Sequence, residues 1–221
     1  MYNKNYDSKL MEISHYKSYP SLMPFIGKKF DETESPRILL IAESHYLPDH
    51  STISMNADDW YNSNYSSLSA DETDWMHTRN IASCDWSSDG HMIFRELENH
   101  LAKVIDNSDA RAMDSCAYMN GFQRPSPKTG ESIKNFCLEI DFIKSAETIN
   151  EVIKVIKPNL VIFVSKFTWD ALAWRIVNNH KDSQFNFVCH PGTGGRYWHK
   201  KGYPHGVQKF ITLISKFGKK M

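Results

Sequence analysis

Two segments of the chain place a reactive side chain directly after a run of apolar residues. Residues 37–42 lead into Glu43, and residues 185–190 end on the imidazole of His190. Both runs have the length and composition of buried strands. In an open α/β sheet, ligands bind in the crevice beyond the carboxyl ends of the strands. The sequence therefore predicts a carboxylate and an imidazole at one crevice, a pair suited to acid–base or electrostatic catalysis.

The elements that must position these side chains alternate between strand and helix. Branched apolar residues with flanking turns predict four buried strands, at residues 37–42, 114–120, 159–165 and 185–190. Helical spacing of apolar residues predicts four helices, at residues 91–105, 147–156, 166–177 and 207–217. We expect an α/β fold, a three-layer α/β/α sandwich with a four-stranded, mainly parallel central sheet. One domain is expected to span residues 1–221.

A long polar segment interrupts this alternation at about residues 49–90. It is rich in Ser, Asn and Asp and contains Trp60, Trp75 and Trp86. A polar segment of this length inside a compact domain usually has a function or forms small helices of its own. It is predicted either as a lid over the crevice or as packing against the domain, and the sequence favours neither.

The formal net charge of +0 conceals an uneven distribution of charge. Between residues 58 and 89, seven acidic side chains are opposed only by Arg79. After Asp182 the chain has no acidic residue, and the basic residues that follow are Arg196, Lys200, Lys201, Lys209, Lys216, Lys219 and Lys220. This end of the chain predicts a basic surface suited to phosphates. An ordinary solvated, lysine-rich helix and tail is the other interpretation.

Several classes of protein are disfavoured by the sequence. The four cysteines (Cys84, Cys116, Cys137 and Cys189) form no Cys-x-x-Cys pair, and the histidines lack the tight spacing of known ligand sets. We therefore expect no metal, no iron–sulfur cluster and no cofactor, and we expect Cys116 and Cys189 to be buried free thiols. No apolar run approaches the roughly 18 residues of a membrane span. A cytoplasmic protein that contacts no membrane is expected.

The motifs that follow the predicted strands resemble, in their order, those of the uracil-DNA glycosylase superfamily. Ala42-Glu43-Ser44-His45-Tyr46 resembles the first-strand loop that lines the base pocket. Asn120, followed by Arg124-Pro125, resembles the second-strand motif that reads the base, and His190-Pro191-Gly192 resembles the fourth-strand histidine motif. The resemblance covers roughly residues 36–217, and it is the order and spacing of the motifs that carries it.

The chain departs from the family pattern at several positions. Ala42 stands where glycine is usual, and Ser44 and His45 stand where small residues or proline follow the carboxylate. Gly192 stands where serine is usual, and the cysteine ligands of the iron–sulfur branches are absent. The bulkier His45 could narrow the pocket or change the base it accepts. Membership of the superfamily is therefore better supported than specificity for uracil.

The resemblance implies a DNA glycosylase that hydrolyses the N-glycosidic bond of uracil or a related damaged base in DNA. Its transition state carries positive charge on the sugar and negative charge on the base. The catalytic residues implied are Glu43, which would stabilise the sugar or orient a water, and His190, which would donate to the base carbonyl. The implied base-binding residues are Asn120, Tyr46, Phe122 and His45. The implied DNA-binding residues are Arg196, Tyr197, Trp198, Lys200 and Lys201.

Other interpretations of the same residues remain open at this point. A superfamily member could bind nucleic acid or nucleotides without cutting, because a fold does not fix a function. Ser44 resembles the nucleophile of acyl hydrolases, although the glycines and the following helix of that elbow are missing. Structural roles are also open: Glu43 could form a salt bridge with Arg124 or Arg79, and His190 could serve a turn. The Asn120-Gly121 pair is likewise common in turns. Tyr197 and Trp198 could cap the core instead of touching DNA, and the sequence slightly favours this interpretation.

Overall fold

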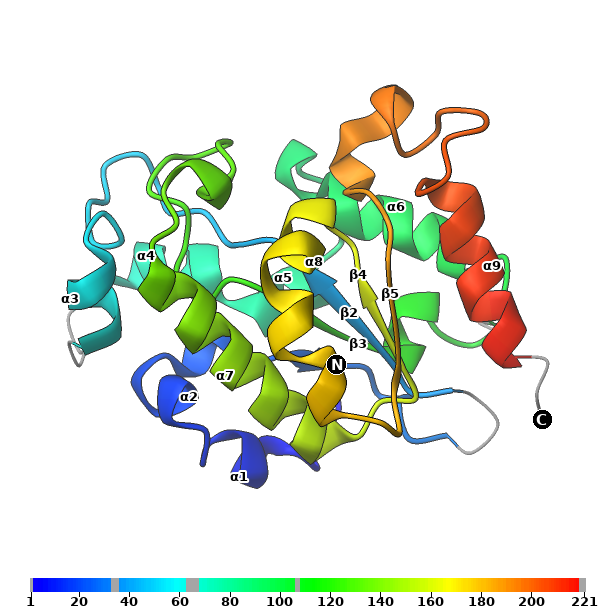
Figure 1. The fold of residues 1–221 in the computed structure, drawn as a ribbon, viewed down its shortest axis with the longest axis horizontal. Helices are drawn as coiled ribbons and strands as arrows, with labels where there is room; N and C mark the ends of the chain where they lie inside the picture. The colour runs from blue at the N-terminus through cyan, green and yellow to red at the C-terminus, as the bar shows by residue number, and fades with distance from the viewer. Residues whose placement is uncertain (1, 33–35, 63–67, 106–107, 219–221) are drawn as a thin grey trace.

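The chain folds around a five-stranded mixed β-sheet (Figure 1). The computed structural model describes residues 2–32, 36–62, 68–105 and 108–218. The strands are β1 (Phe25–Ile26), β2 (Ile38–Ala42), β3 (Cys116–Asn120), β4 (Leu160–Phe163) and β5 (Gln184–Phe187). Their order across the sheet is β1-β3-β2-β4-β5. Strands β2 to β5 run parallel, whereas β1 pairs antiparallel with β3.

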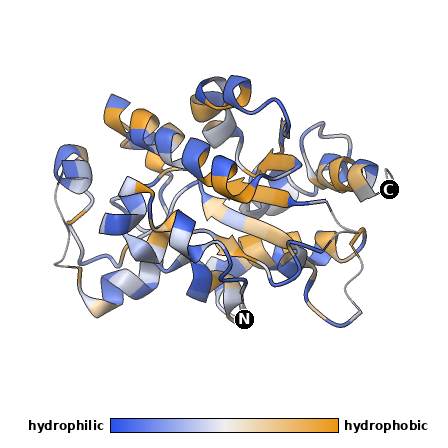
Figure 2. Ribbon diagram, turned by 90° about the horizontal axis from the view of Figure 1, so that it is seen from below, coloured by the Kyte–Doolittle hydropathy of each residue, from blue (hydrophilic) through white to orange (hydrophobic). Residues whose placement is uncertain are grey.

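The α/β class predicted from the sequence is confirmed, and each predicted strand corresponds to one of β2 to β5. The sheet has five strands because the two-residue β1 adds an antiparallel edge, and two residues carry no period from which a strand could be predicted. All of β2 and β3 is buried, whereas β5 lies at the other edge and is partly exposed. The strands appear largely hydrophobic in Figure 2, and the surrounding helices carry both colours.

The predicted helices are present with altered ends. The α-helices of the described residues are α1 (Asp7–Leu10), α2 (Ser14–Ser18), α3 (Ala57–Asn62), α4 (Ala70–Met76), α5 (Thr78–Ser83), α6 (Met92–Leu101), α7 (Glu139–Ile156), α8 (Lys166–Leu172) and α9 (Val207–Gly218). Short 3₁₀ turns connect them, among them η4 (Ile133–Asn135), η5 (Ala173–Arg175) and η7 (Pro191–Arg196). Helix α7 begins well before the predicted residue 147, and α8 ends early and continues as η5. Among the residues that the structure describes, no helix is both long and apolar enough to cross a bilayer.

Apolar side chains pack against both faces of the sheet. Leu39 and Ile41 of β2 point into one core, which α7 and α8 cover. Ile38 and Leu40 point into the other core, which α6 and α9 cover. Alternate residues of a strand face opposite sides, so this single strand contributes to both cores. Figure 1 shows α7 and α8 in front of the strands, with α9 to the right.

The polar segment at about residues 49–90 is built into the body of the molecule. It forms α3, α4 and α5 and contributes to both cores. Trp60 is fully buried and stacks on Tyr19 with ring centroids 4.2 Å apart. Its indole N–H donates to the Gln123 carbonyl oxygen at 3.2 Å. Trp86 is also buried, whereas Trp75 is exposed. Packing against the domain, the second of the two interpretations, therefore describes the α3 part of this segment.

A buried ion pair joins this segment to the loop after β3 and to α7. The Arg124 guanidinium donates to both oxygens of Asp141, at 2.8 and 2.7 Å. Arg124 and Asp141 are 1% and 0% exposed. The remaining guanidinium donors reach the carbonyl oxygens of Ser54 (2.6 Å) and Phe136 (2.8 Å). Asp141 also accepts from the backbone N–H of Leu138 and so caps the start of α7.

We expect Arg124→Leu to lower the free energy of unfolding by about 3–5 kcal/mol, because it leaves a buried, unpaired carboxylate. Urea-induced unfolding measures the change. Removing both charges, in Arg124→Leu/Asp141→Leu, is expected to recover part of the loss. Lys154→Ala, which removes an exposed pair with Glu151, is the control and should change stability by less than about 1 kcal/mol. An Arg124→Leu variant as stable as the wild type would contradict this role of the pair.

Candidate active site

The candidate site lies at the point in the sheet where the chain connections lead in opposite directions. Strand β2 leads to β3 on one side of it, and β4 leads to β5 on the other, so the boundary between β2 and β4 is the topological switch point. Glu43 follows β2, and Ser165 lies just beyond the end of β4. The Ser165 hydroxyl donates to Glu43 Oε2 at 3.0 Å. A carboxylate and a hydroxyl therefore meet at the position where open α/β sheets bind their ligands.

Glu43 is held by hydroxyl groups and not by a cation. Besides Ser165, the Ser132 hydroxyl donates to its Oε1 atom. The two arginines considered as salt-bridge partners are engaged elsewhere, Arg124 with Asp141 and Arg79 with Asp7, the latter at 2.7 Å. Among the residues that the structure describes, no ion pair includes Glu43. The salt-bridge interpretation of Glu43 is therefore wrong, and both oxygens of its carboxylate accept from hydroxyl groups instead.

His190 stands two strands away from Glu43, at the end of the segment that follows β5. The backbone N–H of Gly192 donates to its Nδ1 atom at 3.1 Å. Because Nδ1 is an acceptor, the proton of the neutral imidazole is on Nε2. Burial lowers the pKa of His190, and the Glu43 carboxylate raises it by a smaller amount, so the net shift is downward. A neutral His190 can thus donate a hydrogen bond from Nε2.

The spacing of the strands sets the distance between the chain segments that carry Glu43 and His190. Strands β2 and β5 are separated by β4, and neighbouring strands lie about 4.8 Å apart, so the backbones of β2 and β5 are about 10 Å apart. The effect of Glu43 on the pKa of His190 places the two groups within electrostatic range.

Asn120 and two tyrosines lie on the β3 side of Glu43. Asn120 ends β3 beside Ala42 and is 7% exposed. The Tyr118 hydroxyl donates to Asn120 Oδ1 at 3.4 Å, which fixes one end of this amide. Tyr46 is 37% exposed. Burial, together with the Glu43 carboxylate, raises its pKa. Tyr46 therefore has an accessible ring near Glu43, and Asn120 remains beside the crevice.

Gly121, which follows Asn120, allows the chain after β3 to pack closely against its neighbours. A Cβ atom on Gly121 would lie 2.3 Å from Thr168 Cγ2 and 3.1 Å from the Ala42 carbonyl oxygen. Only glycine allows the chain to pass this close to α8. The backbone N–H of Gly121 donates to that Ala42 carbonyl, at 3.2 Å, so β3 remains paired with the chain leaving β2.

Two predicted base-binding residues point into the interior. Phe122 is 1% exposed, and its ring stacks on Phe167 with centroids 5.2 Å apart. His45 is buried, and its Nε2 lies 2.9 Å from the Thr78 hydroxyl. Both side chains belong to the packing that supports the loop of Glu43. The structure corrects the prediction that they contact a base, because neither ring has a free face in the crevice.

The loop after His190 separates its predicted DNA-binding residues into two groups. Trp198 is fully buried, and its indole N–H donates to Glu96 Oε2 at 2.9 Å, so this side chain packs in the core and does not lie on a DNA surface. The other predicted contacts are exposed: Arg196, Tyr197, Lys200 and Lys201. Within the described part of the chain, Arg196, Lys200 and Lys201 form no ion pair. They are available for an anionic partner.

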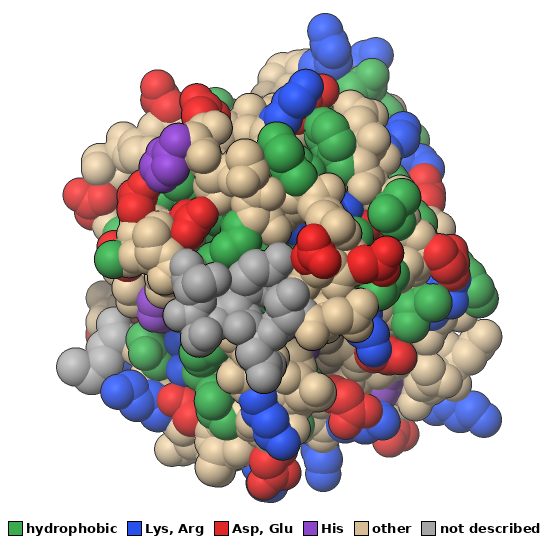
Figure 3. Space-filling view, turned by 90° about the vertical axis from the view of Figure 1, so that its left-hand side faces the viewer, with side chains coloured by type: hydrophobic (Ala, Val, Ile, Leu, Met, Phe, Trp, Pro, Cys, Tyr) green, Lys and Arg blue, Asp and Glu red, His purple; other side chains and the backbone are tan. Residues whose placement is uncertain are grey.

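Acidic and basic groups lie at opposite ends of the molecule. The exposed acids of α3 and α4 are Asp58, Asp59, Asp71 and Asp74. Acidic side chains gather at the upper left of Figure 3, a view onto the side where α3 and α4 lie. Figure 1 shows η7 and α9 far from α3. Of the predicted basic residues, Lys219 and Lys220 lie outside the described residues. The acids of α3 and α4 therefore do not neutralise the basic loop.

The other nucleophile candidates are poorly placed for catalysis. Ser44 is followed by extended chain, and the next helix, α3, begins only at Ala57. The acyl-hydrolase interpretation requires a helix directly after the serine, so the structure does not support it. Cys116 and Cys189 are buried free thiols, as predicted. Burial raises the pKa of both thiols, which makes them poor nucleophiles.

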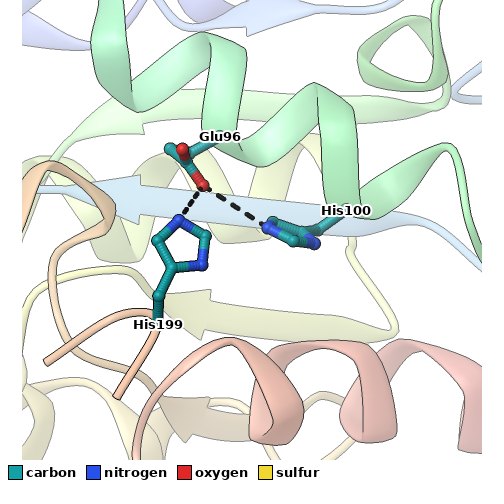
Figure 4. A group of neighbouring side chains, drawn as sticks. All are labelled: Glu96, His100 and His199. Carbon is teal, nitrogen blue, oxygen red and sulfur yellow. Dashed lines mark ion pairs between the residues drawn. The ribbon is translucent and has the colours of Figure 1, made fainter. Parts of the chain in front are cut away.

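One group of side chains with ligand chemistry was missed in the sequence. Glu96 and His100 lie one turn apart on α6, and His199 approaches them from the loop after η7 (Figure 4). One ligand atom from each lies within 4.8 Å of the others. A search for spacing between histidines could not find this group, because one member is a glutamate and His199 is distant in sequence. The Glu-x-x-x-His spacing on a predicted helix was the available signal.

We expect the burial of His45 to make the protein less stable in acid. Burial, with a smaller contribution from His77, lowers the pKa of His45 to about 3. The unfolded chain takes up this proton near pH 6.5, so the stabilisation is complete above that pH and is lost as the pH falls toward 3. Between pH 7 and pH 5, His45→Gln should lose about 2 kcal/mol less unfolding free energy than the wild type.

Urea titrations at the two pH values measure this difference. His50→Gln is the matched control, because the His50 side chain is 71% exposed. It should show the pH dependence of the wild type. If His45→Gln and the wild type lose the same stability between pH 7 and pH 5, His45 is not the buried neutral group described above.

Comparison with known proteins leaves the chain without an assigned family. No protein-family model matches it, and no curated protein matches it. A functional conclusion must therefore come from this chain's own residues. The residues at or just beyond the carboxyl ends of the parallel strands are Glu43, Asn120, Ser165 and His190, and the exposed Tyr46 lies in the loop after β2.

Proposed function

We propose that the chain is a divergent member of the uracil-DNA glycosylase superfamily, with a three-layer α/β/α fold built on four parallel strands. It hydrolyses the N-glycosidic bond of uracil or a related damaged base in DNA. One observation supports the proposal: Glu43, which has no ion-pair partner among the described residues, follows β2 at the switch point and acts on the pKa of His190, whose Nδ1 accepts from Gly192. A carboxylate opposite a neutral hydrogen-bond donor matches the two charges that develop when a base leaves its sugar.

His190 acts on the departing base. When the bond to the sugar breaks, the electron pair stays with the base, and negative charge appears on its carbonyl oxygen. An Nε2–H group directed at this oxygen stabilises the charge without transferring a proton. The lowered pKa of His190 keeps the imidazole neutral near pH 7, and the Gly192 N–H keeps the proton on the nitrogen that faces away from the turn.

Glu43 acts on the sugar. Cleavage leaves positive charge on the ring carbon and ring oxygen, and an ionised carboxylate nearby lowers the energy of this state. Hydrogen bonds from Ser132 and Ser165 fix both oxygens of Glu43 before the substrate arrives. Because the carboxylate is already fixed by these hydrogen bonds, less reorganisation of the site is needed to reach the transition state. A water next to the carboxylate then attacks the sugar carbon and gives its proton to Glu43. The proton passes from Glu43 through solvent to the base anion, which completes the hydrolysis and restores the carboxylate.

Two further side chains are suited to hold the base. Tyr46 offers an exposed ring on which a flipped base can stack. Asn120 combines a donor and an acceptor on one amide and lies beside the crevice. Because the Tyr118 hydroxyl already donates to Oδ1 of this amide, its NH₂ group is the part that reads a base carbonyl.

The second candidate is a protein of the same fold that binds nucleic acid or nucleotides without cutting. The hydrogen bonds of Ser132 and Ser165 favour it, because each removes a lone pair of Glu43 from use by an attacking water. Both candidates use the same crevice and the same basic loop. They differ in whether base release occurs.

Base release is tested with duplex and single-stranded oligonucleotides that carry uracil, hypoxanthine or a mismatched thymine, followed by alkali treatment. We expect strand scission by the wild type on at least one substrate. Glu43→Gln and His190→Ala should each lower the rate by about 100-fold or more, because each removes a charge-stabilising group. DNA binding should be largely retained in both variants.

His180→Ala is the matched control, since His180 is bonded to Asn150 on another part of the surface. It should release base at the wild-type rate. Wild-type binding without scission at enzyme excess would support the second candidate. Full scission by His190→Ala would show that the catalytic assignment is wrong.

We expect the exposed lysines after η7 to supply the electrostatic part of DNA affinity. Each phosphate contact contributes about −0.9 to the slope of log affinity against log salt concentration on duplex DNA. Lys200→Ala/Lys201→Ala should therefore reduce the magnitude of the slope by about 2. Lys144→Ala/Lys154→Ala, on the exposed side of α7, is the control and should leave the slope unchanged. Fluorescence anisotropy at several salt concentrations measures it.

A further inference from the structure

Three side chains near η7 have the arrangement of metal ligands. Glu96 Oε2 lies 2.9 Å from His199 Nε2 and 3.4 Å from His100 Nε2. The three ligand atoms all lie within 4.8 Å of one another. Glu96 and His100 come from adjacent turns of α6 and point to the same side, while His199 faces them from the η7 loop (Figure 4).

These distances are close to those of a tetrahedral zinc site. Zn²⁺ binds imidazole nitrogen and carboxylate oxygen at about 2.0–2.2 Å, which places neighbouring ligand atoms about 3.3 Å apart. The Glu96–His100 distance already has this value, and the Glu96–His199 distance is slightly shorter. The ligand nitrogens of His100 and His199 lie within 4.8 Å of each other, and rotation of the exposed His199 side chain can adjust this separation. Two histidines and one glutamate also form a known three-ligand set for Zn²⁺.

Burial and hydrogen bonding favour a defined site. The side chains of His100 and Glu96 are 10% and 21% exposed, so two of the three ligands are largely held in place by packing. The buried Trp198 donates its indole N–H to Glu96 Oε2 at 2.9 Å and orients the carboxylate. The carboxylate oxygen has a second lone pair available for a cation. His199 is 42% exposed, so the fourth coordination position faces water.

One nearby positive charge must move when a cation binds. Lys103 Nζ lies 3.0 Å from His100 Nδ1. A His100 that coordinates through Nε2 carries its proton on Nδ1 and no longer accepts from this ammonium. Lys103 is exposed at the end of α6 and has a flexible side chain that can turn into solvent. The charge of Glu96 remains to offset that of the ion.

We propose that Glu96, His100 and His199 bind one divalent transition-metal cation, with Zn²⁺ as the best fit. The ion fastens the loop after η7 to α6 and thereby restrains the segment that extends from His190 to His199. Because α6 precedes β3 and the loop follows β5, the ion links distant parts of the chain. The proposal is independent of the glycosylase assignment, since it concerns the chain's affinity for an ion and not base release.

The full chain, treated with a chelator and then dialysed, is titrated with ZnCl₂ in a calorimeter. We expect one saturable site per chain, and a rise in the thermal unfolding midpoint as Zn²⁺ is added, because the ion binds only the folded form. His199→Ala and Glu96→Gln should each weaken binding by about tenfold or more and abolish the rise in midpoint. Addition of Co²⁺ should give the visible absorption bands of a tetrahedral complex.

Two further variants separate ligation from loss of folding. His199→Cys substitutes one zinc ligand for another and should restore binding that His199→Ala loses. His50→Ala removes an exposed histidine elsewhere and should bind as the wild type does. Absence of saturable binding by the wild type would overturn the proposal, as would equal affinity of the wild type, His199→Ala and Glu96→Gln.

Discussion

The buried ion pair of Arg124 and Asp141 is the constraint on which the region around the crevice depends. Two opposite charges at 1% and 0% exposure are tolerated only when nearly all their hydrogen-bonding capacity is used. The guanidinium meets this condition by binding three separate segments, the start of α7, the turn before it and the segment preceding α3. The loop after β3 is fixed as a result, and that loop is hydrogen-bonded to the chain leaving β2, where Ser126 donates to the His45 carbonyl at 2.8 Å. The position of Glu43 therefore depends on a charge pair that never touches it.

The strands were predictable because their signal is local. A short run of branched apolar residues has few alternatives once turns flank it, and β2 to β5 were found in this way. The start of α7 was not predictable from the same kind of signal. Its first turn is capped by Asp141, which is buried only because Arg124, distant in sequence, reaches it. Likewise β1 is too short to have a pattern and exists because β3 offers it an edge.

The candidate site was predictable to the extent that topology determines it. Parallel strands bring their carboxyl ends to one edge, so Glu43 and His190 could be assigned to the same edge of the sheet from the order of the elements. The direction in which a loop side chain points has no such rule. Phe122, His45 and Trp198 have the residue types that bind bases and DNA, yet each was drawn into the interior by a partner the sequence did not reveal: Phe167, Thr78 and Glu96. Residue type was predictable, and burial in the loops was not.

The burial of His190 also opposes the formation of an ion pair between His190 and Glu43. A protonated His190 near Glu43 would be attracted to it and would neutralise the charge that a substrate could use. Burial opposes that protonation and is the larger effect on the pKa of His190. The Gly192 N–H then leaves only Nε2 to carry the proton. The turn interpretation and the catalytic interpretation of His190-Pro191-Gly192 are thus compatible, because the hydrogen bond that makes the turn is also the one that selects the donor nitrogen. This combination of burial and local geometry keeps His190 a neutral donor, so that it does not protonate or pair with the Glu43 carboxylate.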